Sequence, residues 1–119
     1  EFVRKCVSKK ICKKEVAELK YYIDHHLSER LTLSFLKDQV NLSEKYMCTV
    51  FKQVTGKSII EYINEKRMEK AGELLLTTDK RMKEISDAVG IPDQFYLSKL
   101  FKKHYGMTPT QYKNKNPYK

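Results

Sequence analysis

The segment Tyr46-Met47-Cys48-Thr49-Val50-Phe51-Lys52 occurs again fifty residues later as Tyr96-Leu97-Ser98-Lys99-Leu100-Phe101-Lys102. The match continues at the same spacing beyond both copies, with Gly56 and Gly106, Ser58 and Thr108, and Tyr62 and Tyr112. An internal repeat of this kind predicts a structural unit that is built twice.

The first copy has the pattern of a helix, a turn and a second helix. Thr32 is placed to cap a short helix, Asn41 suits a left-handed turn, and Ser43 is placed to cap the next helix. That second helix is expected to make about three turns and to stop at Gly56. The side chains expected to face the core are Leu33, Leu36, Val40, Met47, Val50 and Phe51.

The second copy repeats this pattern with stronger turn residues. Gly90 supplies the left-handed position, Pro92 ends the short helix and Asp93 caps the next one. Beyond Gly106, the segment 108–111 combines a cap, a proline and a glutamine, which predicts a last short helix. The side chains expected to face the core are Met82, Ile85, Val89, Leu97, Leu100 and Phe101, and the last short helix contains Tyr112.

Two further helices are expected. One begins near Val16 and ends near Glu29, with its apolar face formed by Val16, Leu19, Tyr22, Ile23, His26 and Leu27. The other begins at a capping box, Ser58 with Glu61, and its about nineteen residues span roughly 28 Å. Its inward stripe is Ile60, Ile63, Arg67, Ala71, Leu74 and Leu75. The fold class is therefore all-α, with about seven helices in two helix-turn-helix subdomains joined by a long central helix.

The chain of 119 residues accommodates one compact domain or two very small ones. The expected division is a linker or frayed basic segment at 1–14, a first unit at 15–57, a connecting helix at 58–77, a second unit at 78–113, and a disordered tail at 114–119. Asp79-Lys80-Arg81 breaks the apolar pattern after the connecting helix.

The net charge of +9 is concentrated at the two ends of the chain. Residues 1–14 carry six basic side chains and one acidic side chain, and residues 94–119 carry six lysines and no acid. A basic surplus on an otherwise balanced chain favours a polyanion as partner.

Several other classes of protein lack their signatures here. No apolar run approaches the roughly 18 residues of a membrane span. The three cysteines have no zinc-ligand spacing, and their low number fits a reducing cytoplasm. His25, His26, His104 and Cys48 form no recognisable nucleophile pattern, and no phosphate loop or carboxylate pair is present. We therefore expect no catalytic residues, no metal site, no cofactor and no membrane partner.

The second helix of each copy has a face opposite its core, which we call its reading face. A helix of about 10–12 Å diameter fits the major groove of DNA. The first reading face presents Glu44, Lys45, Cys48, Thr49 and Lys52, and the second presents Gln94, Phe95, Ser98, Lys99 and Lys102.

Each reading face divides into base-contacting and phosphate-contacting candidates. Gln94 is suited to a bidentate contact with adenine, and Lys99 to the acceptors of guanine. Phe95 either meets a thymine methyl or packs in the core. The candidates for base reading are Lys45, Cys48, Thr49, Gln94, Phe95, Ser98 and Lys99. The candidates for phosphate contact are Ser43, Lys52, Lys57, Lys102 and Lys103.

The chain resembles the DNA-binding domain of the AraC/XylS family of bacterial transcription activators, and its second copy carries the most specific part of the match. The residues that carry the resemblance are Glu84-Ile85-Ser86, Val89-Gly90-Ile91, Tyr96 through Lys103, Gly106-Met107-Thr108-Pro109, and Tyr62-Ile63, Arg67, Ala71 and Leu74-Leu75 in the connecting helix. The resemblance covers residues 16–113. Departures include Ile91, Ser86, Phe95 and Lys37, and Thr49 where a basic residue is common.

The resemblance implies two recognition helices that enter successive major grooves of a non-palindromic promoter site. Because Thr49 replaces a basic residue, the first recognition helix is expected to contribute more to DNA affinity than to sequence discrimination. The implied partners are double-stranded DNA, RNA polymerase and a missing sensor or receiver domain, and a start at Glu1 instead of Met agrees with a fragment of a longer cytoplasmic protein. The alternative is a basic helical module that binds another protein.

Overall fold

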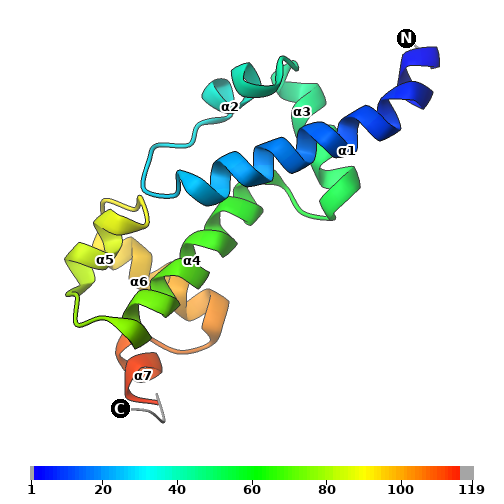
Figure 1. Cartoon of the computed structure of the whole chain (residues 1–119). Coiled ribbons are helices and arrows are strands. Elements are labelled where there is room, and N and C mark those ends of the chain that lie inside the picture. The colour runs from blue at the N-terminus through cyan, green and yellow to red at the C-terminus, as the bar shows by residue number, and fades with distance from the viewer. Residues whose placement is uncertain (1, 116–119) are drawn as a thin grey trace. The chain divides into compact units, whose positions relative to one another are not determined.

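The computed structural model describes residues 2–115, and the side chains of residues 13–115. Over this range it is entirely helical, as predicted, with seven helices (Figure 1). Their bounds are α1 Phe2–His25, α2 Leu33–Val40, α3 Glu44–Thr55, α4 Ile59–Thr77, α5 Met82–Ala88, α6 Gln94–Tyr105 and α7 Pro109–Asn114.

The helices form two compact units. The first unit holds the residues up to His26 together with Leu31–Tyr62, so α1 packs with α2 and α3. The second unit holds Leu27–Arg30 and the chain from Ile63 onward. In Figure 1, α5, α6 and α7 gather around the C-terminal part of α4.

The caps predicted from the sequence are confirmed. The hydroxyl oxygens of Thr32 and Ser43 accept from backbone N–H groups at 3.1 and 3.2 Å, and the Asp93 carboxylate accepts from two. Both capping boxes are present: Ser58 with Glu61, and Thr108 with Gln111. The positive φ angles fall at the expected positions, Asn41 (55°), Gly56 (80°), Gly90 (78°) and Gly106 (77°).

The helix α1 was expected to end near Glu29, but it ends at His25. The His26 backbone N–H turns to the carbonyl of Ile23, only three residues back. The His26 Nδ1–H donates to the Tyr22 carbonyl at 2.8 Å. This carbonyl would accept from the His26 backbone N–H if the helix continued, so the side chain takes the place of that backbone donor. The four residues that follow, Leu27–Arg30, belong to the second unit.

The two ends of the chain were predicted to lie outside the helical units. The structure continues α1 back to Phe2, through residues 2–14 of the segment predicted to be a linker or a frayed basic segment. At the other end α7 finishes at Asn114, and residues 116–119 of the predicted tail lie outside the described residues.

Most side chains predicted to face inward from α1, α2 and α3 are buried in the first unit, but Tyr22, His26 and Leu33 are half-buried. Leu27 lies beyond α1 in the second unit. One residue of α4 also differs from its prediction. Ile60, predicted to point inward, is 50% exposed, whereas Ile59 is 2% exposed. Ile59 takes the place that Pro109 takes in the second unit, directly after the capping hydroxyl, and both are buried. The buried side chains are Val16, Leu19, Ile23, Leu31, Leu36, Val40, Met47, Val50, Phe51, Ile59 and Tyr62.

The second unit buries a cluster drawn from α4, α5, α6 and the turn between the last two. Phe101 has no exposed surface, and its ring makes an edge-to-face contact with the ring of Tyr112. Tyr105 donates a 3.3 Å hydrogen bond to the Met68 carbonyl, and burial raises the pKa of its phenol to about 12. The fully buried members are Met68, Ala71, Leu75, Ile85, Val89, Ile91, Leu97 and Phe101.

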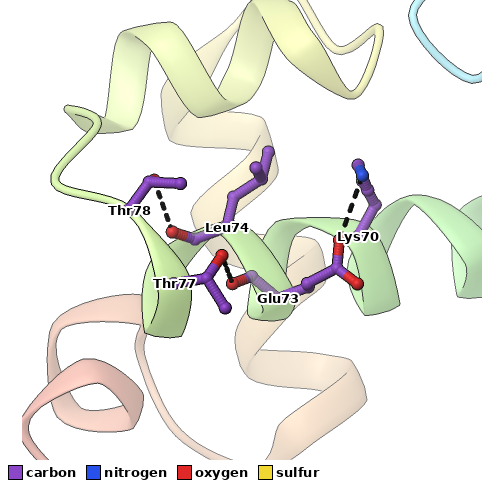
Figure 2. A network of polar contacts seen from close by, with 5 residues as sticks. All are labelled: Lys70, Glu73, Leu74, Thr77 and Thr78. Carbon is purple, nitrogen blue, oxygen red and sulfur yellow. Dashed lines mark hydrogen bonds and ion pairs between the residues drawn. The ribbon is translucent and has the colours of Figure 1, made fainter.

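Two threonine hydroxyls donate hydrogen bonds to backbone carbonyls of the last turn of α4 (Figure 2). Thr77 donates to the Glu73 carbonyl at 2.7 Å, and Thr78 donates to the Leu74 carbonyl at 2.6 Å. Lys70 forms an exposed 3.0 Å ion pair with the Glu73 carboxylate, which contributes little stability at such a solvated site. The helix ends at Thr77, just before the predicted break at residues 79–81.

Candidate nucleic-acid interface

The helices α3 and α6 have the same length and the same surroundings. Each has twelve residues, follows a short helix and a tight turn, begins after a side-chain cap and ends at a glycine with positive φ. The burial pattern of residues 43–61 matches that of residues 93–111 except at positions 44/94, 46/96 and 50/100. The repeat in the sequence is therefore also a repeat in structure.

The first reading face is open to solvent. Lys45, Thr49 and Lys52 are exposed, and Cys48 is half-buried. The Thr49 hydroxyl donates to the Lys45 carbonyl at 2.9 Å, so its oxygen can still accept a hydrogen bond. Burial, and then the nearby Glu44, raise the pKa of the Cys48 thiol. The thiol therefore stays protonated and uncharged at neutral pH.

The second reading face decides between the two alternatives for Phe95. Its side chain is 73% exposed, so the alternative of core packing is wrong. Lys99 is exposed one turn further on, while Gln94 and Ser98 are half-buried. The Ser98 hydroxyl donates to the Gln94 carbonyl at 3.1 Å, in the same way as Thr49 in α3 but one position earlier in the repeat.

The phosphate-contact candidates lie at the ends of the two helices. Ser43 is exposed, and its hydroxyl accepts from the Tyr46 N–H, so its own proton is available to donate. Its counterpart in the second unit is Asp93, whose carboxylate would repel a phosphate. Lys102 and Lys103 lie in the exposed last turn of α6, where the helix dipole favours positive charge.

The other two candidates lie near the end of α3. Lys52 is exposed, and Lys57 is half-buried just beyond Gly56. Two hydrogen bonds from Ser58, and more weakly these two lysines, hold the pKa of the Glu61 carboxyl below its usual value. The lysines therefore lie beside an acid as well as beside the reading face.

The sequence patterns did not single out Tyr96 as a candidate for contact. It is 52% exposed and directly follows Phe95, so α6 begins with two exposed aromatic rings. The repeat pairs Tyr96 with Tyr46, and a matched tyrosine in both copies suggested a structural residue. Tyr46 is indeed half-buried, whereas Tyr96 is exposed. Tyrosine hydroxyls are common donors to DNA phosphates.

The turn before α6 is held by contacts from a distant part of the chain. Arg67 Nη2 donates to the Glu29 carbonyl at 2.9 Å, across 38 residues of sequence. A Cβ atom on Gly90 would lie 2.2 Å from the Leu27 carbonyl oxygen and 3.1 Å from Arg67 Nη2. Within the turn, the Ser86 hydroxyl donates to the Ile91 carbonyl. These contacts all surround the turn that leads into α6.

Neither a metal site nor a membrane span is found in the part of the chain that the structure describes. Its His, Cys, Asp and Glu side chains form no group of three that could hold a metal ion. Among the same residues, no helix is both long and apolar enough to cross a bilayer.

Comparisons with known proteins agree with this geometry. A family model described as a helix-turn-helix domain matches residues 36–115. The bifunctional transcriptional activator/DNA repair enzyme AdaA of Bacillus subtilis is 37% identical over 92 residues, which are 77% of this chain and 44% of AdaA. The xylose operon regulatory protein of Escherichia coli K12 is 32% identical over 101 residues, 85% of this chain and 26% of that protein. The chain thus spans less than half the length of these relatives.

Solved structures show the same fold. The C-terminal domain of AraT, a response regulator from Geobacillus stearothermophilus, superimposes with a TM-score of 0.82 at 40% identity, covering 84% of both chains. The DNA-binding domain of AdpA, solved in complex with a target DNA, gives a TM-score of 0.80 at 23% identity, covering 83% of this chain and 89% of the other. The chain therefore belongs to the AraC/XylS family of helix-turn-helix transcription regulators, as its two helix-turn-helix copies, the matched family model and these relatives show.

Proposed function

We propose that this domain binds double-stranded DNA in a sequence-specific manner within a bacterial transcription regulator. The observation that carries the proposal is the arrangement of α6. Its inner side is fully buried through Leu97 and Phe101, while Phe95, Lys99 and Lys102 lie exposed at intervals of four and three residues. Such a row follows one side of a helix, and its composition suits base edges flanked by phosphates.

Within this proposal the two kinds of contact have different tasks. The base readers are Lys45, Cys48 and Thr49 on α3 and Gln94, Phe95, Ser98 and Lys99 on α6. The phosphate contacts are Ser43, Lys52, Lys57, Lys102 and Lys103, which fix the register of each helix on the duplex without reading its sequence.

The DNA site is proposed to be non-palindromic and about two turns long, with α3 and α6 in successive major grooves. The two reading faces differ at most positions, so each half of the site carries its own sequence. Thr49 stands where α6 has Lys99, and the uncharged Cys48 thiol stands where α6 has Ser98. We therefore assign most of the discrimination to the half-site that α6 reads.

Two further partners follow from the same proposal. RNA polymerase is the protein that a DNA-bound activator acts upon, and the similar regulators AdaA and Btr of Bacillus subtilis are named transcriptional activators. A sensor or receiver domain is the second, since these relatives are much longer than the matched region. Because DNA is the ligand, we place the domain in the cytoplasm.

The proposal predicts a steep dependence of DNA affinity on salt. Four lysine–phosphate contacts give a slope of about −3.6 in log K against log salt, so binding should weaken roughly 150-fold between 50 and 200 mM salt. Electrophoretic shift or fluorescence anisotropy on promoter duplexes measures this slope. If the chain binds no duplex even at low salt, a helical protein-interaction module becomes the better description.

Single lysines should separate base reading from phosphate contact. Lys99→Ala is expected to cost about 1–3 kcal/mol on the preferred duplex and to relax the preference at one base pair. Lys102→Ala should weaken binding to all duplexes alike and reduce the salt slope by about one. Both lysines are exposed on α6, so neither change should unfold the domain. Identical behaviour of the two variants would contradict the assignment of their roles.

A further inference from the structure

The first residues of α3 and α6 occupy the same position of the repeat but differ in chemistry, and Glu44 is exposed whereas Gln94 is half-buried. Glu44 begins α3 and Gln94 begins α6, each directly after an extended residue whose side chain caps the helix. Recognition helices commonly contact base edges through their N-terminal residues. Positions 44 and 94 therefore present two side chains of nearly equal size at the same point of two matching helices.

These two side chains recognise different bases. A carboxylate only accepts hydrogen bonds, whereas an amide both donates and accepts. The major groove offers donors only from the amino groups of cytosine and adenine, and adenine sets an acceptor beside its amino group. A carboxylate is therefore best matched to cytosine, and an amide is best matched to adenine.

The Glu44 carboxylate lies in the first turn of α3, where the helix dipole favours negative charge. The side chain is exposed, and its carboxylate makes no hydrogen bond or ion pair with any side chain in the described residues. Besides burial, its negative charge also raises the pKa of the Cys48 thiol, one helical turn along the same reading face. Glu44 thus lies beside a proposed base reader.

An acid on a DNA-binding face acts against indiscriminate binding. The carboxylate repels phosphates, so it weakens contact with any duplex that does not offer it a hydrogen-bond donor. The same carboxylate strengthens binding where an amino group meets it. The ratio of specific to non-specific affinity rises as a result, which is how repulsive elements produce specificity.

We infer that Glu44 is a specificity-determining residue that selects cytosine in the half-site read by α3, while Gln94 selects adenine in the half-site read by α6. The inference rests on the proposed function, because it requires that both helices enter a major groove. At this position the two helices differ by one group, a carboxylate oxygen on Glu44 in place of an amide nitrogen on Gln94. That difference gives the two half-sites different preferred bases.

The test begins with the unchanged chain, which selects its preferred duplexes from a randomised library. Glu44→Gln, Glu44→Ala and Gln94→Glu are then compared with it on duplexes that vary at one base pair. Glu44→Gln should move the preference at one base pair from cytosine to adenine by about tenfold, and Gln94→Glu should produce the opposite change in the other half-site. Glu44→Ala should lose the cytosine preference without gaining one for adenine.

Glu18→Gln is the matched control for charge, because it removes one exposed carboxylate from α1 and leaves both recognition helices intact. It should leave every base preference unchanged. If Glu44→Gln strengthens binding to all duplexes equally, Glu44 acts only through its charge and the inference is wrong. If the unchanged chain selects no sequence at all, the proposed function fails instead, so the two failures are distinguishable.

Discussion

Gly90→Ala is expected to lower the free energy of unfolding by about 2–5 kcal/mol, the sum of two separate costs. The backbone at Gly90 has a φ of +78°, a conformation that costs an L-residue roughly 1–2 kcal/mol. A Cβ atom would also lie 2.2 Å from the Leu27 carbonyl oxygen, so backbone must move. Overpacking of this kind costs about 1–3 kcal/mol more. Urea unfolding followed by circular dichroism measures the total.

Two other glycines separate these two costs. Gly56 and Gly106 have nearly the same φ, +80° and +77°, but a Cβ atom on either would meet nothing within 4 Å. Gly56→Ala and Gly106→Ala should therefore cost only the backbone term, about 1–2 kcal/mol. The excess in Gly90→Ala measures how tightly Leu27–Arg30 packs against the turn before α6. Equal losses in all three variants would show that this packing contributes nothing.

Local features of the sequence predicted most of the fold. The starts of α2, α3, α4, α6 and α7 were predictable because a capping side chain such as Ser43 or Asp93 acts on backbone groups only two or three residues away. The start of α1 was not, since α1 begins at Phe2 and not near Val16. Each left-handed turn was predictable because few residues tolerate positive φ, and Asn41 and Gly90 are two of these types. The repeat then checked one unit against the other.

Contacts between distant segments were not predictable. Nothing local indicates that Arg67 donates to Glu29, and this contact places Leu27–Arg30 in the second unit. The exposure of Ile60 was also missed, because both Ile59 and Ile60 fit a helical stripe with Ile63. Only the comparison of Ile59 with the buried Pro109 distinguishes them, and that comparison was available in the repeat.

For the candidate interface, the sequence predicted which faces are open but not what they bind. The buried stripe of α6 leaves the opposite side exposed, and this settled the position of Phe95 once the helix was in place. The choice of base is a different matter, since it depends on free-energy differences between complexes with DNA. The assignments of Gln94 and Lys99 therefore stay predictions.

Phe101→Ala should remove about 3–5 kcal/mol of stability, as expected for truncating a fully buried phenylalanine. The ring has no exposed surface, and its centroid lies 4.5 Å from that of Tyr105 and 5.3 Å from that of Tyr112. The cavity would loosen α6 from α4 and α7, so DNA affinity should fall on every duplex. Denaturant unfolding and anisotropy titrations on the same samples measure both effects.

Phe95→Ala is the matched control, since it truncates the same residue type on the same helix at a site that is 73% exposed. Its stability should change by no more than about 0.5 kcal/mol, because surface substitutions that break no packing are nearly neutral. Its DNA preference should change nonetheless, with thymine losing its advantage at one base pair where a methyl group meets the ring. The two phenylalanines would then show that one side of α6 stabilises the fold and the opposite side contacts DNA bases. A large loss of stability in Phe95→Ala, or an unchanged base preference, would contradict that division.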